Sequence, residues 1–483
     1  MSGALVSTCV ALDEAEVLDA NGLRRVLSSA REAGARLVSL HGRRADARLL
    51  VTAVTATDDG GLSVARAALD AAEPFASLTP ELEAAHVFER ELHEQTGALV
   101  VGHPWLKPLR SEDGELARYP YYGIDGKEIV EVAVGPVHAG IIEPGSFRFS
   151  CHGEVVHHLE IQLGYQHRGA ERLCVERRPE HVPHLVETVS GDSSVAHAWA
   201  HAAALEALSG TAISDAVDDA RAVMLELERV GTHLATLAGL AADIGHLQGA
   251  TTYGRLRTTA INLSMRLCGS RFGRGAVRPG GARVAALDDA VQGALAQLTR
   301  DHELIDTAFF GALSVQHRLR GVGVLPRETA VSLGVVGLTA RASGVSVDAR
   351  PRTRGPWARA PIDRPTRDDG DCWARGRLRG DEIRASLAWL SSRAASRPRG
   401  VGPGAGPAPL APRHLSVALV EGQRGEVVHA LETDDDGRVV HHKLQDPSLR
   451  NWMGLALAVR GEEISEFPIC NKSFDLSYAG HDL

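Results

Sequence analysis

The chain has 483 residues, of which 44% are hydrophobic and 23% are charged, and its formal net charge is −9. This length allows two domains or one domain with a large core, and the composition is that of an ordinary globular protein. The acidic balance argues against a general nucleic-acid binder, because such a protein needs a broad basic face.

The cysteines and the apolar segments exclude two further classes. The six cysteines are widely scattered and form no Cys-x-x-Cys pair, so their spacing indicates neither a zinc site nor a thioredoxin-like motif. No apolar run approaches the roughly 20 residues that a membrane-spanning helix needs. Any contact with a membrane is therefore expected to go through a partner.

Residues 1–112 predict an α/β domain. Asn21 is placed to cap a first helix, and Gly97 to end a later one. The other stretches are assigned from their hydrophobic periodicity. The expected elements are a helix over residues 22–33, strands over 36–40 and 47–56, and helices over 65–72 and 82–97.

Residues 113–130 predict a turn-rich connector, and residues 131–483 a second, larger domain. Between residues 195 and 319 apolar side chains recur at intervals of three and four, which is typical of a helical bundle. Because the last residues are apolar and aromatic, we expect them to be buried. The other expected elements are strands over 129–134, 146–151, 155–162, 414–422, 426–432 and 438–444, and a helix over 452–459.

Residues 348–412 have a different character. Positions 348–399 hold 13 arginines against 7 acidic residues, together with several prolines, and 400–412 is rich in proline and glycine. Proline interrupts helices, so the stretch predicts an irregular, solvated insertion with one helix over 381–390. A basic surface that docks an acidic partner subunit is the alternative.

Several long motifs in this chain resemble those of one superfamily. They are Gly135-Pro-Val-His138, Glu143-Pro-Gly145, Gly164-Tyr-Gln-His-Arg-Gly-Ala-Glu171, Leu225-Glu-Leu-Glu-Arg229, Arg271-Phe-Gly-Arg-Gly-Ala-Val-Arg-Pro-Gly280 and Asp446-Pro-Ser-Leu-Arg-Asn-Trp452. They resemble the large subunit shared by membrane-bound, energy-converting nickel–iron hydrogenases and respiratory complex I. The motifs Glu89-Arg-Glu-Leu-His-Glu94 and Gly102-His-Pro-Trp-Leu-Lys107 resemble the complex I subunit that packs beside it. The presence of both sets of motifs in one chain is similar to the formate hydrogenlyase large subunit. The resemblance leaves out roughly residues 350–412.

The resemblance implies an α+β fold, in which an N-terminal α/β domain precedes a large helical-bundle domain with a small antiparallel sheet. It implies a partner subunit that carries an iron–sulfur cluster, and antiporter-like membrane subunits. The chain would then be a peripheral protein at the cytoplasmic face of the cell membrane.

The family holds nickel and iron with four thiolates, supplied as two Cys-x-x-Cys pairs. By alignment, the first pair falls on Ser190 and Ser193, and the second on Cys470 and Ser473. Three of the four sulfurs are therefore replaced by hydroxyls, which are poor ligands for a soft metal. We expect no nickel–iron centre and no metal bound by this chain.

The residues that remain at the aligned site can exchange protons. His138, Glu143, Asp192 and His197 are the candidate proton relay or acceptor site, because burial shifts the pKa values of carboxylates and imidazoles in opposite directions. The alternative is that His138 and Glu143 only fix the shape of their loop. A quinone is one candidate acceptor, although the family's quinone-contacting histidine and tyrosine align with Ile142 and Gly191.

Three functions stay open at this point. The chain is an oxidoreductase subunit, a non-catalytic scaffold that joins the iron–sulfur and membrane subunits, or a hydrogenase with unusual ligands. The chain has no phosphate-binding glycine loop, so NAD and ATP are not expected. The adjacent pairs His157-His158 and His441-His442 lie on predicted strands with their rings on opposite faces, which is typical of surface or core histidines.

Overall fold

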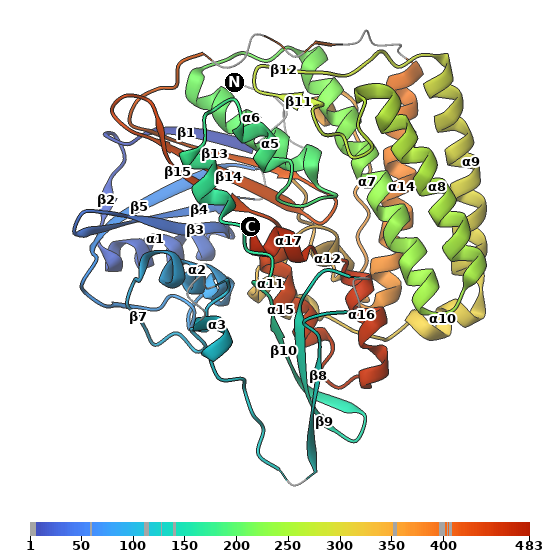
Figure 1. The fold of residues 1–483 in the computed structure, drawn as a ribbon, viewed down its shortest axis with the longest axis horizontal. Helices are drawn as coiled ribbons and strands as arrows, with labels where there is room; N and C mark the ends of the chain where they lie inside the picture. Colours follow the sequence, from blue (N-terminus) through green and yellow to red (C-terminus); the bar gives the residue numbers. More distant parts are fainter. Residues whose placement is uncertain are drawn as a thin grey trace.

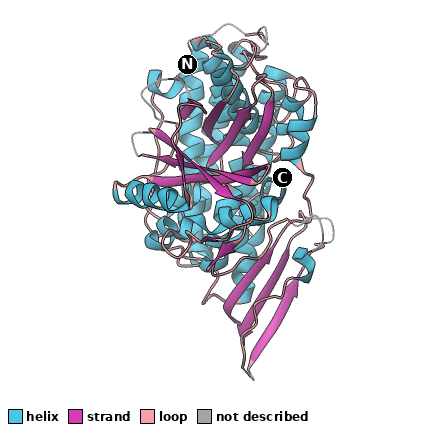
Figure 2. Cartoon of the chain, turned by 90° about the vertical axis from the view of Figure 1, so that its left-hand side faces the viewer, coloured by secondary structure: helices cyan, strands magenta, loops and turns pink. Residues whose placement is uncertain are grey.

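The computed structural model describes residues 6–57, 60–110, 115–126, 128–138, 142–350, 355–395, 401–402, 404 and 408–483. These residues combine helices with several small sheets, which confirms the predicted α+β class. Figure 1 shows sheets on the left and long helices on the right. A smaller sheet extends away from both (Figure 2).

The N-terminal region is built on a four-stranded sheet of order β2-β5-β4-β3. Its apolar side chains and those of two helices share one core, which includes Leu23, Leu40 and Phe88. The elements are β2 (Val17–Leu18), α1 (Ala20–Glu32), β3 (Arg36–Ala45), β4 (Arg48–Ala56), β5 (Leu62–Asp70), β6 (Phe75–Ala76), α2 (His86–Thr96), β7 (Val100–Val101) and α3 (Glu115–Arg118).

In this region the helix predicted over 65–72 and the cap predicted at Asn21 are wrong, whereas the first helix, the two strands and the helix that ends at Gly97 are confirmed. Most of residues 65–72 lies in strand β5, since nine cross-strand pairs with β4 outweigh the helical preference of its alanines. Asp19, and not Asn21, caps α1, because its carboxylate accepts a hydrogen bond of 2.6 Å from the backbone of Gly22. The helix predicted to end at Gly97 does so, with Gly97 at φ 65°.

A second four-stranded sheet joins the two ends of the chain. Strand β1 (Val6–Ala11) pairs with β13 (His414–Glu421), which is followed by β14 (Glu426–Thr433) and β15 (Val439–Gln445). One hydrophobic cluster contains Val38 and Val54 together with Leu415 and other residues of this sheet. The three C-terminal strands were predicted, whereas β1 was not.

The helical bundle predicted after residue 195 is confirmed, and it has one more long helix than expected. Helices α7, α8, α9 and α14 run side by side at the right of Figure 1. The helices are α4 (Ala170–Glu176), α5 (Val182–Val186), α6 (Ser194–Ser209), α7 (Asp215–Asp243), α8 (Leu247–Cys268), α9 (Asp289–Gly311), α10 (Leu313–Leu319), α11 (Arg327–Ser332), α12 (Gly337–Ala342), α13 (Pro356–Arg359) and α14 (Cys372–Ala395).

The helix predicted over residues 381–390 is part of α14, but the prediction of an irregular, solvated segment is wrong for the other residues of this helix. This helix is central to the bundle. Two of its arginines, Arg375 and Arg379, are buried and donate to backbone carbonyls, and the partly exposed Arg377 pairs with Asp306 at 2.9 Å. Arg350 contacts Asp348 at 2.7 Å, and Arg341 contacts Glu382 of α14 at 2.5 Å. Composition shows the charge of a segment but not the partners that neutralise it. Residues 351–354, 396–400, 403 and 405–407 lie outside the described part of the chain.

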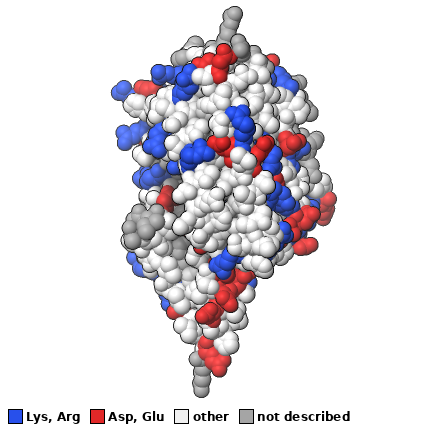
Figure 3. Space-filling model, turned by 90° about the vertical axis from the view of Figure 1, so that its right-hand side faces the viewer, with Lys and Arg blue, Asp and Glu red and all other residues white. Residues whose placement is uncertain are grey.

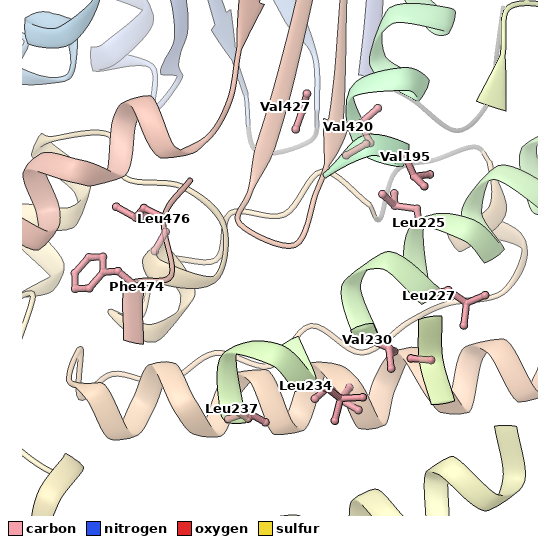
Figure 4. Packing of buried hydrophobic residues seen from close by; sticks show 14 of the residues in the cluster. Val195, Leu225, Leu227, Val230, Leu234, Leu237, Val420, Val427, Phe474 and Leu476 are labelled. Atoms are coloured by element: carbon pink, nitrogen blue, oxygen red, sulfur yellow. The ribbon is translucent and has the colours of Figure 1, made fainter. Parts of the chain in front are cut away.

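The end of the chain is buried, as predicted, against the bundle and the second sheet. Its helices are α15 (Ser448–Ala458), α16 (Phe467–Phe474) and α17 (Tyr478–Asp482). Leu483 is 1% exposed. Figure 4 shows Leu234 and Leu237 of α7 near Phe474 and Leu476, with Val420 and Val427 on the neighbouring β13–β14 hairpin.

A three-stranded sheet leads from the N-terminal region to the loops before α4. It consists of β8 (Ile129–Val134), β9 (Ser146–His152) and β10 (Val155–Gln162), as predicted. The bundle side of the molecule carries a broad area without charged side chains (Figure 3). Within the described residues, no helix is both long enough and apolar enough to span a bilayer.

Candidate functional site

Three segments meet at the N-terminus of α6: the loop at residues 190–193, the turn between β13 and β14, and the chain's last twelve residues. Arg424 of the turn donates two hydrogen bonds of 2.7 Å each to Asp192 of the loop. Arg424 also donates to the backbone carbonyl of Asp475. Burial lowers the pKa of Arg424, but the charge and hydrogen bonds of Asp192 outweigh it and the net shift is upward.

Two serine hydroxyls occupy the space beside this ion pair. Ser190 lies 3.0 Å from the hydroxyl of Ser477 and 3.1 Å from the carboxylate of Asp192. Ser193 exchanges hydrogen bonds with the side chain of Gln423, which follows β13. We call Glu143, Ser190, Asp192, Arg424 and Ser477 the loop site.

The structure changes the register of the predicted second ligand pair. Cys470 and Ser473 contact α14, where Cys470 lies 4.0 Å from Cys372 and the Ser473 hydroxyl accepts a hydrogen bond of 2.8 Å from Arg375. Ser477 is the residue that reaches Ser190. Ser477 and Gly480 have the same spacing as Ser190 and Ser193, so they are the geometric counterpart of the first pair.

Gly480 has no room for a side chain. A Cβ atom built there lies 2.6 Å from the carboxyl carbon of Asp446, which is fully buried. Asp446 is held in place, since its carboxylate accepts hydrogen bonds of 2.8 Å from the backbone of Ser448 and 3.2 Å from His197. Oxygen at three positions and a closed fourth one leave the loop site without a set of soft donors.

Glu143 lies at the loop site, whereas His138 fixes the loop that carries it. Backbone groups of Tyr478 and Ala479 hydrogen-bond to Glu143. Although Glu143 is exposed as a residue, partial burial of its carboxylate raises its pKa, and the charge of Asp192 raises it further. His138 lies 2.8 Å from the backbone carbonyl of Gly145, consistent with the loop-shaping role considered for it.

The fourth predicted residue, His197, lies behind the loop site in the protein core. One ring nitrogen lies 3.2 Å from Asp446 and the other 3.2 Å from His429 of β14. His197 is fully buried, as is Asp446. The structure therefore brings Glu143 and Asp192 together but puts His197 in a separate hydrogen-bonded chain.

Sequence reasoning missed Glu228 of α7. This carboxylate accepts hydrogen bonds of 2.7 Å and 3.2 Å from the backbone of Val195 and Ala196 in the first turn of α6. Burial raises its pKa to about 8, and the charge of Asp192 adds to the effect. A cavity of about 70 Å³ is lined by Asp192 and Glu228. Glu226, two residues earlier on the same helix, instead pairs with Arg229 and Arg350.

The comparisons with known proteins agree with this architecture. Residues 243–401 match the family "Respiratory-chain NADH dehydrogenase, 49 Kd subunit". The matched residues include most of 350–412, so the expectation that the resemblance leaves out this segment is wrong for residues 350–401. A chain from the membrane-bound sulfane sulfur reductase, an archaeal respiratory membrane complex, shares the fold, with a TM-score of 0.67 and 22% identity over 75% of this chain and 100% of that chain.

Curated relatives extend the match over most of the chain. Formate hydrogenlyase subunit 5 of Escherichia coli is 28% identical over 456 residues, which are 86% of this chain and 78% of that protein. An NADH-quinone oxidoreductase subunit of Phocaeicola vulgatus is 30% identical over 394 residues, which are 72% of this chain and 75% of that protein. The chain therefore belongs to the family of large subunits shared by membrane-bound hydrogenases and NADH-quinone oxidoreductases.

Proposed function

We propose that this chain is the peripheral large subunit of a membrane-bound oxidoreductase at the cytoplasmic face of the cell membrane. A partner subunit with an iron–sulfur cluster delivers electrons to an acceptor at the loop site, and antiporter-like membrane subunits move protons or ions in response. Family membership supports the assembly into such a complex. The convergence of ionisable side chains from distant parts of the chain supports the position of the site.

The loop site does not fit a nickel–iron centre. Such a centre needs soft sulfur ligands, but Ser190 and Ser477 offer hydroxyls that already bond each other. The carboxylate of Asp446 occupies the space that a fourth ligand at Gly480 would need. We therefore route no step through nickel, and the acceptor in this proposal is an organic molecule of the quinone type.

Glu143 is the proposed proton donor of the site. Its raised pKa keeps the proton on its carboxylate to higher pH than for an ordinary glutamate, as general acid catalysis near neutral pH requires. Asp192 is bound by Arg424, and its negative charge adds to the effect of burial that raises the pKa of Glu143. Glu228 lines the cavity beside Asp192 and has the pKa of a group that can pass a proton onward.

Replacing Glu143 by glutamine in the assembled complex tests this role. We expect electron transfer to a quinone analogue, and the coupled proton uptake, to fall by about 100-fold, because glutamine keeps the shape but has no acidic proton. Glu131→Gln is the matched control, since Glu131 pairs with Arg148 on the surface of the β8–β9 sheet. Unchanged turnover and proton uptake in Glu143→Gln would count against the proposal.

A non-catalytic scaffold is the second candidate. The observation that favours it is that Ser190, Asp192 and Arg424 satisfy one another and Ser477, as residues that only fix an interface would. Changing Ser190, Asp192 and Cys470 in the assembled complex separates the two functions. If the chain is a scaffold, these substitutions leave acceptor reduction unchanged in any complex that assembles. If the chain is the proposed oxidoreductase subunit, the assembled complex loses acceptor reduction. Hydrogen evolution with bound nickel would instead identify a hydrogenase with unusual ligands.

A further inference from the structure

A cluster of three histidines lies in the core, outside the loop site. His201 comes from the middle of α6, His429 from β14 and His442 from β15. Their exposed fractions are 2%, 0% and 1%. One ring nitrogen from each histidine lies within 4.8 Å of the others. We call these three residues the histidine cluster.

The hydrogen bonds around His429 orient its ring toward the centre of the cluster. Asp446 is an acceptor, so the facing nitrogen of His197 carries a proton and its Nδ1 accepts one from His429 Nε2, at 3.2 Å. His429 Nδ1 then carries the lone pair of its ring and accepts a hydrogen bond of 3.1 Å from His442 Nε2, which a shared metal ion would replace. A carboxylate that orients an imidazole through hydrogen bonds is the usual outer support of a metal-binding histidine.

His201 is the residue that hydrogen bonding leaves unexplained. Neither of its ring nitrogens has a hydrogen-bond partner among the described residues, although both are buried. Its ring stacks on that of His442, with centroids 5.2 Å apart and planes 21° apart. Burying an unpaired polar group is unfavourable, and a ligand that uses the lone pair removes this cost.

We propose that His201, His429 and His442 bind one divalent transition-metal ion, with zinc preferred. Two nitrogens bound to a tetrahedral zinc ion lie about 3.3 Å apart, close to the 3.1 Å between His429 and His442. His201 approaches by a shift of its side chain, and a water molecule completes the tetrahedron. Imidazole nitrogens suit zinc and its neighbours, unlike the oxygen donors of the loop site.

The protonation state of the three imidazole rings supports the proposal. Burial lowers the pKa of His201 to about 4, and it lowers the pKa values of His429 and His442 well below their ordinary range. Neutral imidazole is the form that binds metals. The ion would link α6 to the sheet whose β13–β14 turn carries Arg424. Its binding does not depend on an electron acceptor at the loop site.

Elemental analysis of the purified full-length chain, refolded with zinc and then desalted, tests the proposal. We expect about one zinc ion per chain, a higher melting temperature than for the zinc-free protein, and d–d absorption of a tetrahedral ion after loading with Co²⁺. His201→Ala and His442→Ala should each lose the ion. His197→Ala should weaken binding by about 10- to 100-fold through the lost outer support.

His441→Ala is the matched control. His441 is the next residue on the same strand, but its ring lies beside His41, with centroids 5.5 Å apart. Equal metal content in His441→Ala and His201→Ala indicates adventitious binding and overturns the proposal. So does wild-type protein that takes up no zinc, Co²⁺ or other divalent ion, whether or not the variants fold. Metal content is measured without any electron acceptor, so this result is independent of the proposed oxidoreductase function.

Discussion

The loop site and the histidine cluster lie about two turns apart along α6, yet their polar atoms are in opposite situations. In the loop site, Asp192 is bound by both arms of Arg424, and Ser190 is bound by Ser477. In the histidine cluster, His201 has no hydrogen-bond partner among the described residues. The family resemblance marks the loop site for a metal, but there the protein's own groups bond one another. No resemblance marks the histidine cluster, where both ring nitrogens of His201 lack a hydrogen-bond partner among the described residues.

Asp446 connects the two regions. It packs against Gly480 behind the loop site and accepts a hydrogen bond from His197, which leads to the histidine cluster. Its negative charge also contributes to the raised pKa of Arg424. The comparison shows that polar groups from distant segments satisfy one another at the loop site, whereas His201 in the histidine cluster has no such partner among the described residues.

The largest effect is expected from Asp446→Ala, which removes this connection. The backbone of Ser448 and the ring of His197 each lose a bond to a charged group inside the core. We expect a loss of about 3 kcal/mol in the free energy of unfolding, measured by urea denaturation. Asp446→Asn keeps the shape of the side chain and should cost less. Equal stability of Asp446→Ala and wild type would show that the two regions are independent.

A smaller effect is expected from breaking the ion pair of the loop site. Asp192 is 38% exposed and Arg424 is 7% exposed, so solvent screens part of their attraction. A double-mutant cycle with Asp192→Asn and Arg424→Gln should give a coupling energy of about 1–2 kcal/mol. Additive losses would mean that the pair contributes nothing and that the loop site is held by its hydroxyls alone.

A further effect is a pH dependence that comes from Glu228. Its ordinary pKa of 4.5 is raised to about 8 in the folded protein, so the folded state holds an extra proton between these values. The stabilisation from this proton is complete below the unfolded pKa and is lost as the pH rises through the folded one. The melting temperature of wild type should therefore fall more steeply between pH 5 and pH 8 than that of Glu228→Gln. Parallel profiles would contradict the raised pKa.

Local patterns in the sequence were sufficient for much of the fold. Gly97 ended a helix because its positive φ suits glycine, and alternating apolar residues located β9, β10 and the C-terminal strands. Long motifs identified the family. Residues 65–72 were mistaken for a helix because their pairing with β4 is not visible in their own composition.

The candidate sites depended more on long-range packing. The predicted pair at Cys470 and Ser473 had the correct spacing, but only the fold shows that Ser477 is the residue beside Ser190. His201 and His442 are 241 positions apart and meet because α6 packs on the sheet at β13 and β14, next to β15, so no spacing motif could reveal them. Glu228 was overlooked because its pKa depends on burial and on Asp192.

Oxygen ligands and a closed Gly480 are expected to leave the loop site without nickel and iron. Nickel and iron content of the assembled complex, with the partner's iron–sulfur clusters accounted for, tests this claim most directly when wild type is compared with His201→Ala. The account predicts no stoichiometric nickel in His201→Ala, and no density for a pair of metals between Ser190 and Ser477. One nickel ion per chain that persists in His201→Ala and is lost on changing Ser190 and Ser477 would contradict it.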